Sequence, residues 1–417
     1  MLEQTALSQQ LEAAARDRLR VLIVGAGAAG LTLAQLLRRQ GLHPVLVEKA
    51  APDAAPGYML ALMPLADPVL DALGAMDAYL HHSTPLRRYR IRGRHGQPLR
   101  EYPMARLLSE AGHYRGISRG ALLDVLAAPG GTVTHHTTVT HHTTVTAIEQ
   151  TPTTAHVTLD ARGRSYAGAF DLVVAADGLH STTRQLILAP AEVSTYDTNW
   201  GGWVGWADPD AEADLGWEVW GTGTFIGAYP VKGRVGVIMC GPRATTRRGP
   251  GPFVAHARAG LGAVDARLER ALHQVAHGEE TYFWPLTDCR AARWTAGRVA
   301  LLGDAAAGFL PTAGIGACMA MESAGVLGAH LADAAREEVP RRLQTYERAQ
   351  RPRVEAAQTN SRGLAKLMFR DGHAYSLARD LALRCVPLEA SIRPIRRLLR
   401  SRPSIAPGVR QGDRAPD

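Results

Sequence analysis

The amino-acid sequence predicts an α/β fold with a parallel-sheet domain, a mostly β second domain and C-terminal helices. Three observations carry this prediction. A strand, a glycine-rich turn, a helix and a second strand follow one another in residues 20–48, as in a βαβ unit. Two further apolar runs, residues 171–178 and 297–304, end in Asp-Gly and Gly-Asp. Between these runs, residues 190–284 are rich in Trp and in glycine-broken segments of β type.

Length and composition indicate a soluble globular enzyme of two or three packed domains. The chain has 417 residues, of which 46% are hydrophobic and 21% charged, and its mean hydropathy is −0.11. These values exclude long disordered, collagen-like and coiled-coil chains, and no apolar run is long enough to span a bilayer. The first 20 residues carry acidic and polar side chains where a signal peptide has its apolar core. We therefore expect a cytoplasmic protein.

Charge and cysteine content argue against nucleic-acid and metal partners. The net charge is +8, and 44 of the 47 basic residues are Arg. They are scattered and do not alternate with aromatic residues as a base-stacking groove requires. Cys240, Cys289, Cys318 and Cys385 lie far apart with no C-x-x-C pair, which favours buried thiols over a zinc site or disulfides. We expect a monomer or homodimer that acts on a small organic molecule, with no metal, nucleic acid or membrane as partner.

The first landmark is the turn GAGAAG, which directly follows a buried apolar strand. Gly25, Gly27 and Gly30 permit a tight turn and let the backbone approach a pyrophosphate at the positive end of the next helix. A second apolar strand follows that helix and ends in Glu48, where an acid hydrogen-bonds a ribose hydroxyl. The whole unit predicts a bound dinucleotide, FAD or NAD.

The next part of the chain predicts a hairpin over residues 89–102, with its turn at His95 and Gly96, and a helix that begins near Ser118. Residues 132–143 contain the sequence TVTHHT twice. Neighbouring histidines on a strand point to opposite faces, so these pairs cannot each chelate a metal. We interpret the duplication as a solvated, extended strand pair.

The second and third landmarks are the strands in DLVVAADG and GRVALLGD. Asp177 and Asp304 are common turn-capping residues, but each ends a buried strand, where α/β sheets bind ligands. A loop with Pro311 then leads to a long helix whose N-terminus offers free N–H groups. Near the C-terminus, residues 346–353 and 393–402 predict amphipathic helices with solvated charges.

Together these segments resemble the group A FAD-dependent monooxygenases, the family of p-hydroxybenzoate hydroxylase and the tetracycline-modifying flavoenzymes. The resemblance covers nearly the whole chain and rests on GAGAAG with Glu48, DLVVAADGLHSTTR, LGDAAAGFLPTAGIGACMAMESA and YERAQRPRVEAAQ. It implies a Rossmann-like FAD-binding domain of the glutathione-reductase type. The implied domains are residues 19–85, 116–189 and 285–345 for FAD, residues 86–115 and 190–284 for the substrate, and a helical region of residues 346–417.

The resemblance also implies a role for each matching position. Glu48 is expected on the adenosine ribose, Arg119 on the flavin nucleotide, and Asp304 on the ribityl chain or pyrophosphate region. The loop of residues 311–316 is expected beside the isoalloxazine. The full cofactor set comprises Gly25, Gly27, Ala28, Ala29, Gly30, Glu48, Lys49, Arg119, Asp177, Gly178, Gly303, Asp304, Pro311, Gly314, Ile315 and Gly316. The expected substrate pocket, between the flavin and the second domain's sheet, comprises Trp217, Trp220, Tyr229, Met239 and Phe309.

In this family NAD(P)H reduces FAD, O2 adds to give a C4a-hydroperoxyflavin, and one oxygen atom passes to an electron-rich organic substrate. The protein orients the substrate and keeps water out, so no catalytic triad is expected. The Trp-rich sheet favours an aromatic or polyketide-like natural-product intermediate, which would be hydroxylated, epoxidised or otherwise oxygenated.

Two departures from the family pattern keep a second function open. Ala54 stands where relatives often carry an Arg, and Ala307 stands where many carry a His. Both weaken the case for reduction by NAD(P)H, which leaves the alternative that FAD serves structurally in a non-redox step such as a cyclisation. A flavin halogenase is disfavoured because the W-x-W-x-I-P segment is missing. A plain NAD dehydrogenase would leave the later motifs unexplained, and nothing favours a non-enzymatic nucleotide sensor.

Overall fold

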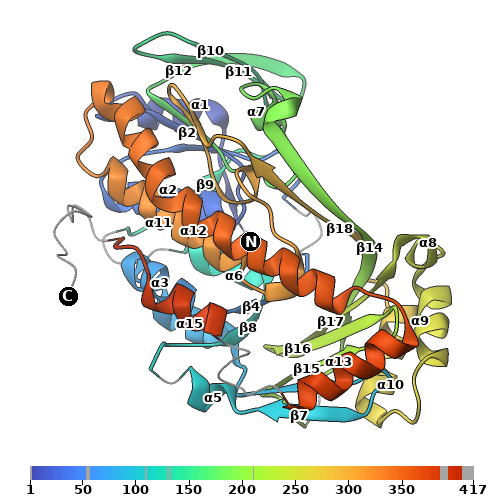
Figure 1. Ribbon diagram of the computed structural model, residues 1–417. Coiled ribbons are helices and arrows are strands. Elements are labelled where there is room, and N and C mark those ends of the chain that lie inside the picture. The colour runs from blue at the N-terminus through green and yellow to red at the C-terminus, as the bar shows by residue number, and fades with distance from the viewer. Residues whose placement is uncertain are drawn as a thin grey trace.

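The computed structural model describes residues 2–52, 57–108, 110–128, 130, 133–209, 211–385 and 393–405. Two large sheets organise it, a five-stranded sheet in the order β19-β20-β13-β2-β3 and a seven-stranded sheet in the order β18-β14-β17-β16-β15-β6-β7. Figure 1 shows the smaller sheet at the upper left and the larger one at the lower right, with long helices running past both.

Four parallel strands form the centre of the five-stranded sheet. β2 (Val21–Val24) lies between β3 (Val45–Val47) and β13 (Leu172–Ala175), and β13 pairs with β20 (Val299–Leu301). Every residue of these four strands is buried, as expected where both faces of a parallel sheet are covered. β19 (Thr295–Ala296) adds a short antiparallel edge. The strands predicted at all three landmarks are therefore confirmed.

Helices cover one face of this sheet. α2 (Ala28–Arg39) contacts α11 (Gly316–Leu331) and α6 (Arg119–Ala127). The hydroxyl of Ser118 accepts a hydrogen bond from the Ala121 N–H at 3.2 Å, so the predicted helix start near Ser118 is confirmed as an N-cap. An antiparallel sheet packs on the other face. Its strands are β10 (Thr143–Gln150), β11 (Ala155–Ala161) and β12 (Arg164–Phe170).

The seven-stranded sheet separates two apolar layers. Its side chains alternate between the cavity described below and helices α9 (Pro250–Ala259) and α10 (Ala266–His277), which cover the outer face. The predicted hairpin is present, with its turn between Gly93 and Gln97. The strands are β6 (Arg88–Arg92), β7 (Pro98–Tyr102), β14 (Val193–Ala207), β15 (Leu215–Trp220), β16 (Phe225–Val231), β17 (Arg234–Pro242) and β18 (Tyr282–Ala291).

Shorter elements complete the body of the molecule. A third sheet, in the order β4-β8-β5, forms part of the cavity wall. Its strands are β4 (Met59–Leu62), β8 (Arg115–Ser118) and β5 (Thr84–Pro85). The small helices are α1 (Leu7–Ala14), α3 (Asp67–Leu73), α4 (Met76–His82), α5 (Met104–Leu107), α7 (Thr182–Gln185) and α8 (Arg243–Thr246).

The TVTHHT duplication does not form a solvated strand pair, so that interpretation is wrong. Within the described part of the duplication, Thr138–Val139 forms a short strand, β9, which pairs in parallel with β1 (Glu3–Gln4), and Thr143 begins β10. His141 is buried, and its Nδ1 lies 3.0 Å from the carbonyl oxygen of Ala50. The second copy is drawn into the protein because Thr140 bridges to Val47 at the edge of the central sheet, whereas His135 in the first copy stays exposed.

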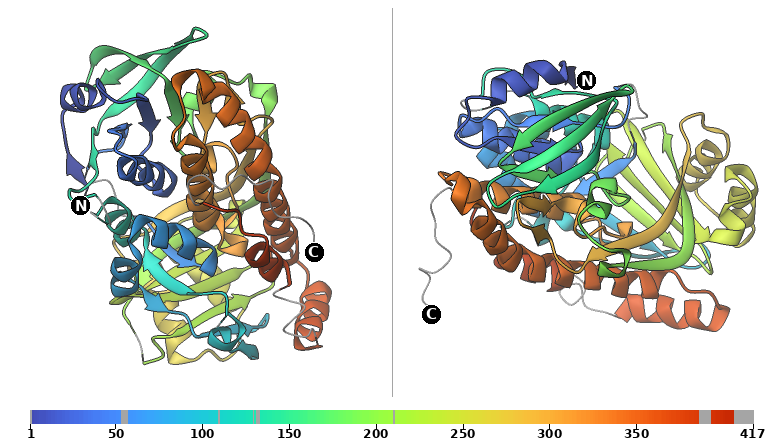
Figure 2. Two further views of the ribbon diagram at one scale, coloured as in Figure 1. Left: turned by 90° about the vertical axis from the view of Figure 1, so that its left-hand side faces the viewer. Right: turned by 90° about the horizontal axis from the view of Figure 1, so that it is seen from above.

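The C-terminal helices lie along one side of the molecule, past both sheets (Figure 2). They are α12 (Val339–Met368), α13 (His373–Cys385) and α15 (Arg393–Arg400). The expectation that all charges of this region face solvent is wrong. Arg353 of α12 is only 11% exposed and forms an ion pair with Glu322 of α11 at 2.7 Å, because α12 packs directly on α11. Within the described residues, no helix is both long and apolar enough to cross a membrane.

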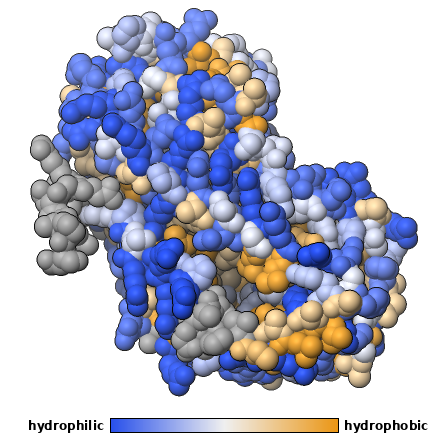
Figure 3. All heavy atoms as spheres, in the orientation of Figure 1, coloured by the Kyte–Doolittle hydropathy of each residue, from blue (hydrophilic) through white to orange (hydrophobic). Residues whose placement is uncertain are grey.

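Helix α13 has an unusual orientation on the surface. It buries Arg379 and Asp380 and exposes Leu377 and Leu381, which are 46% and 54% exposed. Figure 3 shows an apolar patch at the lower right, where Figure 1 places α13. Cys385 at the end of α13 is also exposed, so the expectation of buried thiols holds for the other three cysteines only.

Candidate active site

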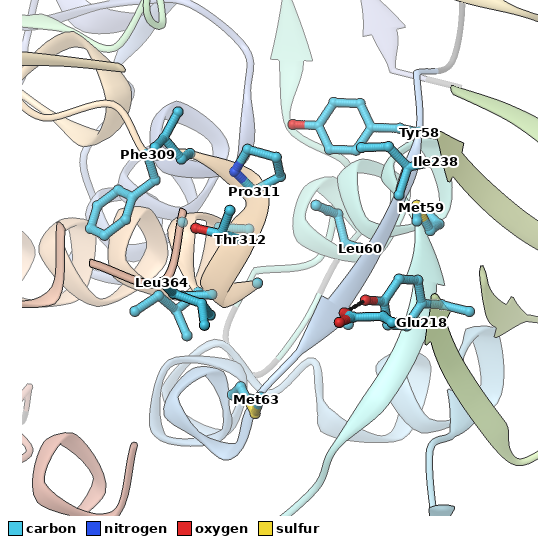
Figure 4. A pocket seen from close by; sticks show the side chains of 18 of the residues that line it. Tyr58, Met59, Leu60, Met63, Glu218, Ile238, Phe309, Pro311, Thr312 and Leu364 are labelled. Carbon is cyan, nitrogen blue, oxygen red and sulfur yellow. Dashed lines mark hydrogen bonds between the residues drawn. The ribbon is translucent and has the colours of Figure 1, made fainter. Parts of the chain in front are cut away.

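A cavity of about 700 Å³ lies between the central sheet, the seven-stranded sheet and helices α11 and α12. This volume is in the range of small-molecule sites. Figure 4 shows the loop with Phe309, Pro311 and Thr312 on one side of the cavity and Glu218 on the other. The wall is mostly apolar. Among the described residues that line it, the charged ones are Arg119, Glu218 and Asp304.

The glycine-rich turn forms the edge of the cavity beside α2. Gly25 has a φ of +107°, and a Cβ there would lie 2.4 Å from the carbonyl oxygen of Ala176. Gly27 is the N-cap of α2, provides no side chain to accept hydrogen bonds from the first helical N–H groups, and has open space where a Cβ would be. Gly27 lines the cavity together with Ala28 and Ala29. The free N–H groups of the α2 N-terminus therefore border a space that can hold an anion.

Glu48 holds the turn from the neighbouring strand. Its carboxylate accepts hydrogen bonds from the N–H groups of Ala26 and Ala50, both at 2.9 Å. Glu48 lies behind the cavity wall, as do Gly25 and Gly30, while Lys49 is exposed. These four predicted cofactor residues thus surround the turn and do not line the cavity themselves.

The chain after β20 forms the opposite edge of the same opening. Gly303 has a φ of +60°, and a Cβ there would lie 2.9 Å from the Cβ of Ala29, so glycine permits close packing of the two turns. Asp304 lines the cavity, and burial raises the pKa of its carboxyl to about 6. The loop then passes through a 3-10 turn, Pro311–Ala313, to Gly314 with a φ of +61°. The predicted loop residues Pro311, Gly314, Ile315 and Gly316 all line the cavity.

At the second landmark, the strand end at Asp177 and Gly178, the glycine lines the cavity and the acid does not. The carboxylate of Asp177 accepts hydrogen bonds from the Ser181 hydroxyl and from the Thr183 N–H, the latter at 3.0 Å, and so fixes the start of α7. Asp177 does not line the cavity, whereas Gly178, with a φ of +83°, does. Arg119, the first residue of α6, lines the cavity as well.

Tyr58 is a cavity residue that the sequence motifs did not reveal. Its ring packs against that of Trp284 at an interplanar angle of 32°, with the ring centroids 4.8 Å apart, and both side chains line the cavity. Burial raises the pKa of the Tyr58 hydroxyl to about 12, with a further contribution from the negative charge of Asp304, while Arg119 opposes the shift. These charge effects indicate that Tyr58, Asp304 and Arg119 share one end of the cavity.

The seven-stranded sheet forms the far wall. Trp220 and Tyr229 line the cavity from this sheet, and Phe309 lines it from the opposite loop, as predicted. Trp217 and Met239 do not, and their assignment to the pocket is corrected. Both are buried in the outer apolar layer with α9 and α10, because successive side chains of a strand point to opposite faces.

Glu218 was also missed, although the sequence contains a signal for it. The run GWEVWG alternates along one strand, so Glu218 shares the face of Trp220. By contrast, no pattern in the sequence indicated the contributions of α12 and the segments after it. The cavity residues from that region are Asn360, Leu364, Leu367, Met368, Phe369, Leu383, Pro394, Ile395 and Leu398.

The two departures from the family pattern fall on different parts of the chain. Ala54 lies outside the described residues. Ala307 is buried, and its N–H donates to the carbonyl oxygen of Gly303 at 3.0 Å. Ala307 therefore stabilises the turn that carries Asp304 and does not line the cavity itself.

Comparison with known proteins identifies the class. A family profile described as "FAD binding domain" matches residues 18–361, so the chain belongs to the family of FAD-dependent group A monooxygenases. FAD is the cofactor of this family, and NAD(P)H is its typical co-substrate. The α2 N-terminus with open space at Gly27, the cationic Arg119 and the buried Asp304 fit a ligand that carries both phosphate groups and hydroxyls.

Individual relatives agree with this class. The chain is 30% identical to the aurachin C monooxygenase/isomerase of Stigmatella aurantiaca over an alignment of 354 positions, which covers 81% of this chain and 86% of that protein. It resembles Klebsiella pneumoniae HpxO in complex with FAD and uric acid, with a TM-score of 0.78, 24% identity, and coverage of 92% and 97% of the two chains. It also resembles the tetracycline destructase Tet(51), with a TM-score of 0.67, 22% identity, and coverage of 93% of this chain and 99% of that chain. The predicted family and fold class are confirmed.

Proposed function

We propose that this protein oxygenates an aromatic or polyketide-like natural-product intermediate with FAD, NAD(P)H and O2. One observation carries the proposal. A single cavity connects the α2 N-terminus and Asp304, at the carboxyl end of the parallel strands, with the aromatic wall of the seven-stranded sheet. Cofactor and substrate can therefore meet inside one continuous cavity. The cavity lies where the segments that we assign to FAD binding, residues 19–85, 116–189 and 285–345, meet the substrate domain of residues 86–115 and 190–284.

In this proposal the turn at Gly27 binds the pyrophosphate through backbone N–H groups, with Ala28 and Ala29 at the start of α2. Glu48, which already accepts two backbone hydrogen bonds, reaches the adenosine ribose. The carboxylate of Asp304 accepts a hydrogen bond from the ribityl chain. The cationic Arg119 balances negative charge on the nucleotide.

Bound FAD, once reduced, supplies the chemistry that activates O2 and delivers an oxygen atom. The residues of this chain position the substrate for that step. The loop with Pro311 and Gly314 lies against the flavin ring, and Trp220, Tyr229 and Phe309 hold the substrate opposite it. The apolar wall excludes water, which protects a reactive intermediate from hydrolysis.

The substrate class follows from the lining and from the relatives. Aromatic side chains and few charges favour a largely apolar ring system over a small acid. One relative is named as an aurachin C monooxygenase/isomerase, which supports an organic substrate of this kind, whereas another is named as a monooxygenase of the small acid 3-amino-4-hydroxybenzoate. The cytoplasmic location and the state as monomer or homodimer stay predictions, and sedimentation of the purified protein tests the latter.

Anaerobic reduction tests the proposed reaction. The purified protein with its bound FAD is mixed with NADH or NADPH, with and without a panel of aromatic compounds, and flavin absorbance is followed at about 450 nm, the band of oxidised flavin. We expect bleaching that is accelerated by a bound aromatic compound and reversed by oxygen. A flavin that stays oxidised with every nicotinamide and compound would overturn the proposal in favour of a non-redox step such as a cyclisation.

A further inference from the structure

The far wall of the cavity carries one buried acid. Glu218 is 6% exposed and lines the cavity beside Tyr89, Tyr114 and Tyr229. Its Oε2 accepts a hydrogen bond from Nε1 of Trp220 at 2.7 Å, and its Oε1 accepts one from the Tyr229 hydroxyl. Side chains from β15 and β16 thus hold this carboxylate in a fixed position.

This cluster has more hydrogen-bond acceptor positions than donor hydrogens. A Tyr hydroxyl and a Trp indole each have a single donor hydrogen, and those of Tyr229 and Trp220 are engaged by Glu218. A carboxylate offers about four acceptor positions, so these two donors leave about two positions open. A donor group on a ligand at this wall can fill them.

No counter-charge neutralises this wall from inside the cavity. Arg119 is the one cationic side chain among the described lining residues, and it acts on Tyr58 and Tyr282 near Asp304. Arg379 lies behind Trp220, where it donates to the carbonyl oxygen of Gly221 at 3.1 Å and does not line the cavity. An anionic substrate group would consequently be repelled by Glu218 without compensation.

The geometry points to Glu218 as the residue that selects and orients the substrate, by accepting a hydrogen bond from an N–H or O–H group at the edge of an otherwise apolar ring system. Ile91, Val204 and Ile238 line the same cavity, so apolar contacts hold the ring while the hydrogen bond to Glu218 fixes one edge. Figure 4 shows Glu218 across the cavity from Phe309 and Pro311. A ring anchored at Glu218 therefore extends toward the loop assigned to the flavin, and in this respect the inference rests on the proposed function.

Burial raises the pKa of Glu218, and the hydrogen bonds from Tyr229 and Trp220 oppose that shift because they stabilise the ionised form.

The test compares three naphthalene probes that differ in one substituent. 1-Naphthol carries a donor, 1-methoxynaphthalene carries none, and 1-naphthoate is an anion. Each probe is titrated into the oxidised FAD-loaded protein without nicotinamide, and binding is followed by the perturbation of the flavin spectrum and by calorimetry. We expect 1-naphthol to bind about tenfold more tightly than either other probe, the usual scale for one hydrogen bond to a charged acceptor. Equal affinities of the wild-type protein for 1-naphthol and 1-methoxynaphthalene would overturn the inference.

Two substitutions at Glu218 and one control separate recognition from folding. Glu218→Gln should reduce the naphthol preference to less than about threefold and should improve 1-naphthoate binding, because the negative charge is gone. Glu218→Leu should abolish the preference. Trp217→Phe, on the same strand but in the outer layer, should leave all three affinities unchanged. If Glu218→Gln bound the three probes with the same order and ratios of affinity as the wild type, the role of Glu218 would be refuted.

These readouts do not depend on turnover. If the probes bind as expected but the flavin is never reduced, the oxygenase proposal fails and the recognition role stands. If reduction and oxygen transfer occur but the probes show no donor preference, the recognition role fails alone.

Discussion

The carbonyl oxygen of Gly25 lies so close to the Cα of Gly30 that a Cβ built on Gly30 would come within 1.9 Å of it. The contact joins the first and third glycines of the turn backbone to backbone, before any ligand is bound. Both groups belong to the backbone and not to a flexible side chain, so the clash can be relieved only if the turn itself moves. Gly30→Ala should therefore destabilise the apoprotein by about 3 kcal/mol, as overpacking in a rigid site does. Thermal unfolding of the apoprotein measures this change, and an unaltered midpoint would contradict it.

Gly27→Ala should have the opposite effects, because it should leave the stability of the apoprotein unchanged and weaken the binding of FAD. A Cβ on Gly27 meets nothing within 4 Å, and the residue has an extended ψ and a negative φ that alanine adopts readily. The added methyl group would occupy the space proposed for the pyrophosphate. We expect an apoprotein as stable as the wild type that binds FAD at least about tenfold more weakly, measured by quenching of FAD fluorescence. Wild-type FAD affinity in this variant would exclude the proposed approach of the pyrophosphate.

Asp304 should give the apoprotein a characteristic pH dependence. Its pKa is raised by burial from 3.8 to about 6, so between these values the folded state binds more protons than the unfolded state. The contribution of Asp304 to the free energy of unfolding therefore falls as pH rises from about 4 to about 6. Asp304→Asn removes the effect. The variant's stability advantage over the wild type should be small below about pH 4 and reach about 3 kcal/mol above about pH 7, since one pKa unit corresponds to about 1.4 kcal/mol.

Urea unfolding of both apoproteins across this pH range isolates the contribution of Asp304, because all other groups cancel in the difference. A difference that does not change with pH would show that the carboxyl titrates normally. In the FAD-loaded protein we expect the wild type to be more stable than Asp304→Asn, because the ionised Asp304 accepts a hydrogen bond from the ribityl chain in our proposal. FAD affinity of the wild type should accordingly weaken below about pH 6.

The ion pair between Arg353 and Glu322 should be important for the packing of α12 on α11. Glu322 is 4% exposed and receives hydrogen bonds from Arg353 at 2.7 and 2.9 Å and from Gln350 at 2.9 Å. Arg353→Met would leave a buried charge without a partner and should cost about 3–5 kcal/mol. Adding Glu322→Gln should recover most of this loss, as chemical denaturation of both variants would show.

Arg351 provides the matched control for this prediction. It lies on the same helix, is 32% exposed, and pairs with Glu347 and Glu355 at one-turn spacing. Arg351→Met should cost less than about 1 kcal/mol, because exposed pairs on a helix contribute little. Equal losses for Arg351→Met and Arg353→Met would indicate that burial does not determine the effect.

The sequence by itself determined the parts of this protein that depend on local patterns. The turn at Gly25, the strand ends at Asp177 and Asp304, and the loop from Pro311 into α11 are each encoded within about a dozen neighbouring residues. Apolar runs predict buried parallel strands, and glycines predict positive φ where a turn requires it. These elements and the family they indicate could therefore be identified without coordinates.

Only the tertiary structure decided which side chains face the cavity. Trp217 and Glu218 are adjacent in the sequence, yet one packs under α10 and the other lines the cavity, because the pairing of β15 with its neighbours sets which face of the strand turns inward. Tyr58 and Leu364 reach the same space from segments about 300 residues apart. Such long-range packing leaves no periodic trace in the chain, since it depends on how the two sheets and α12 come together.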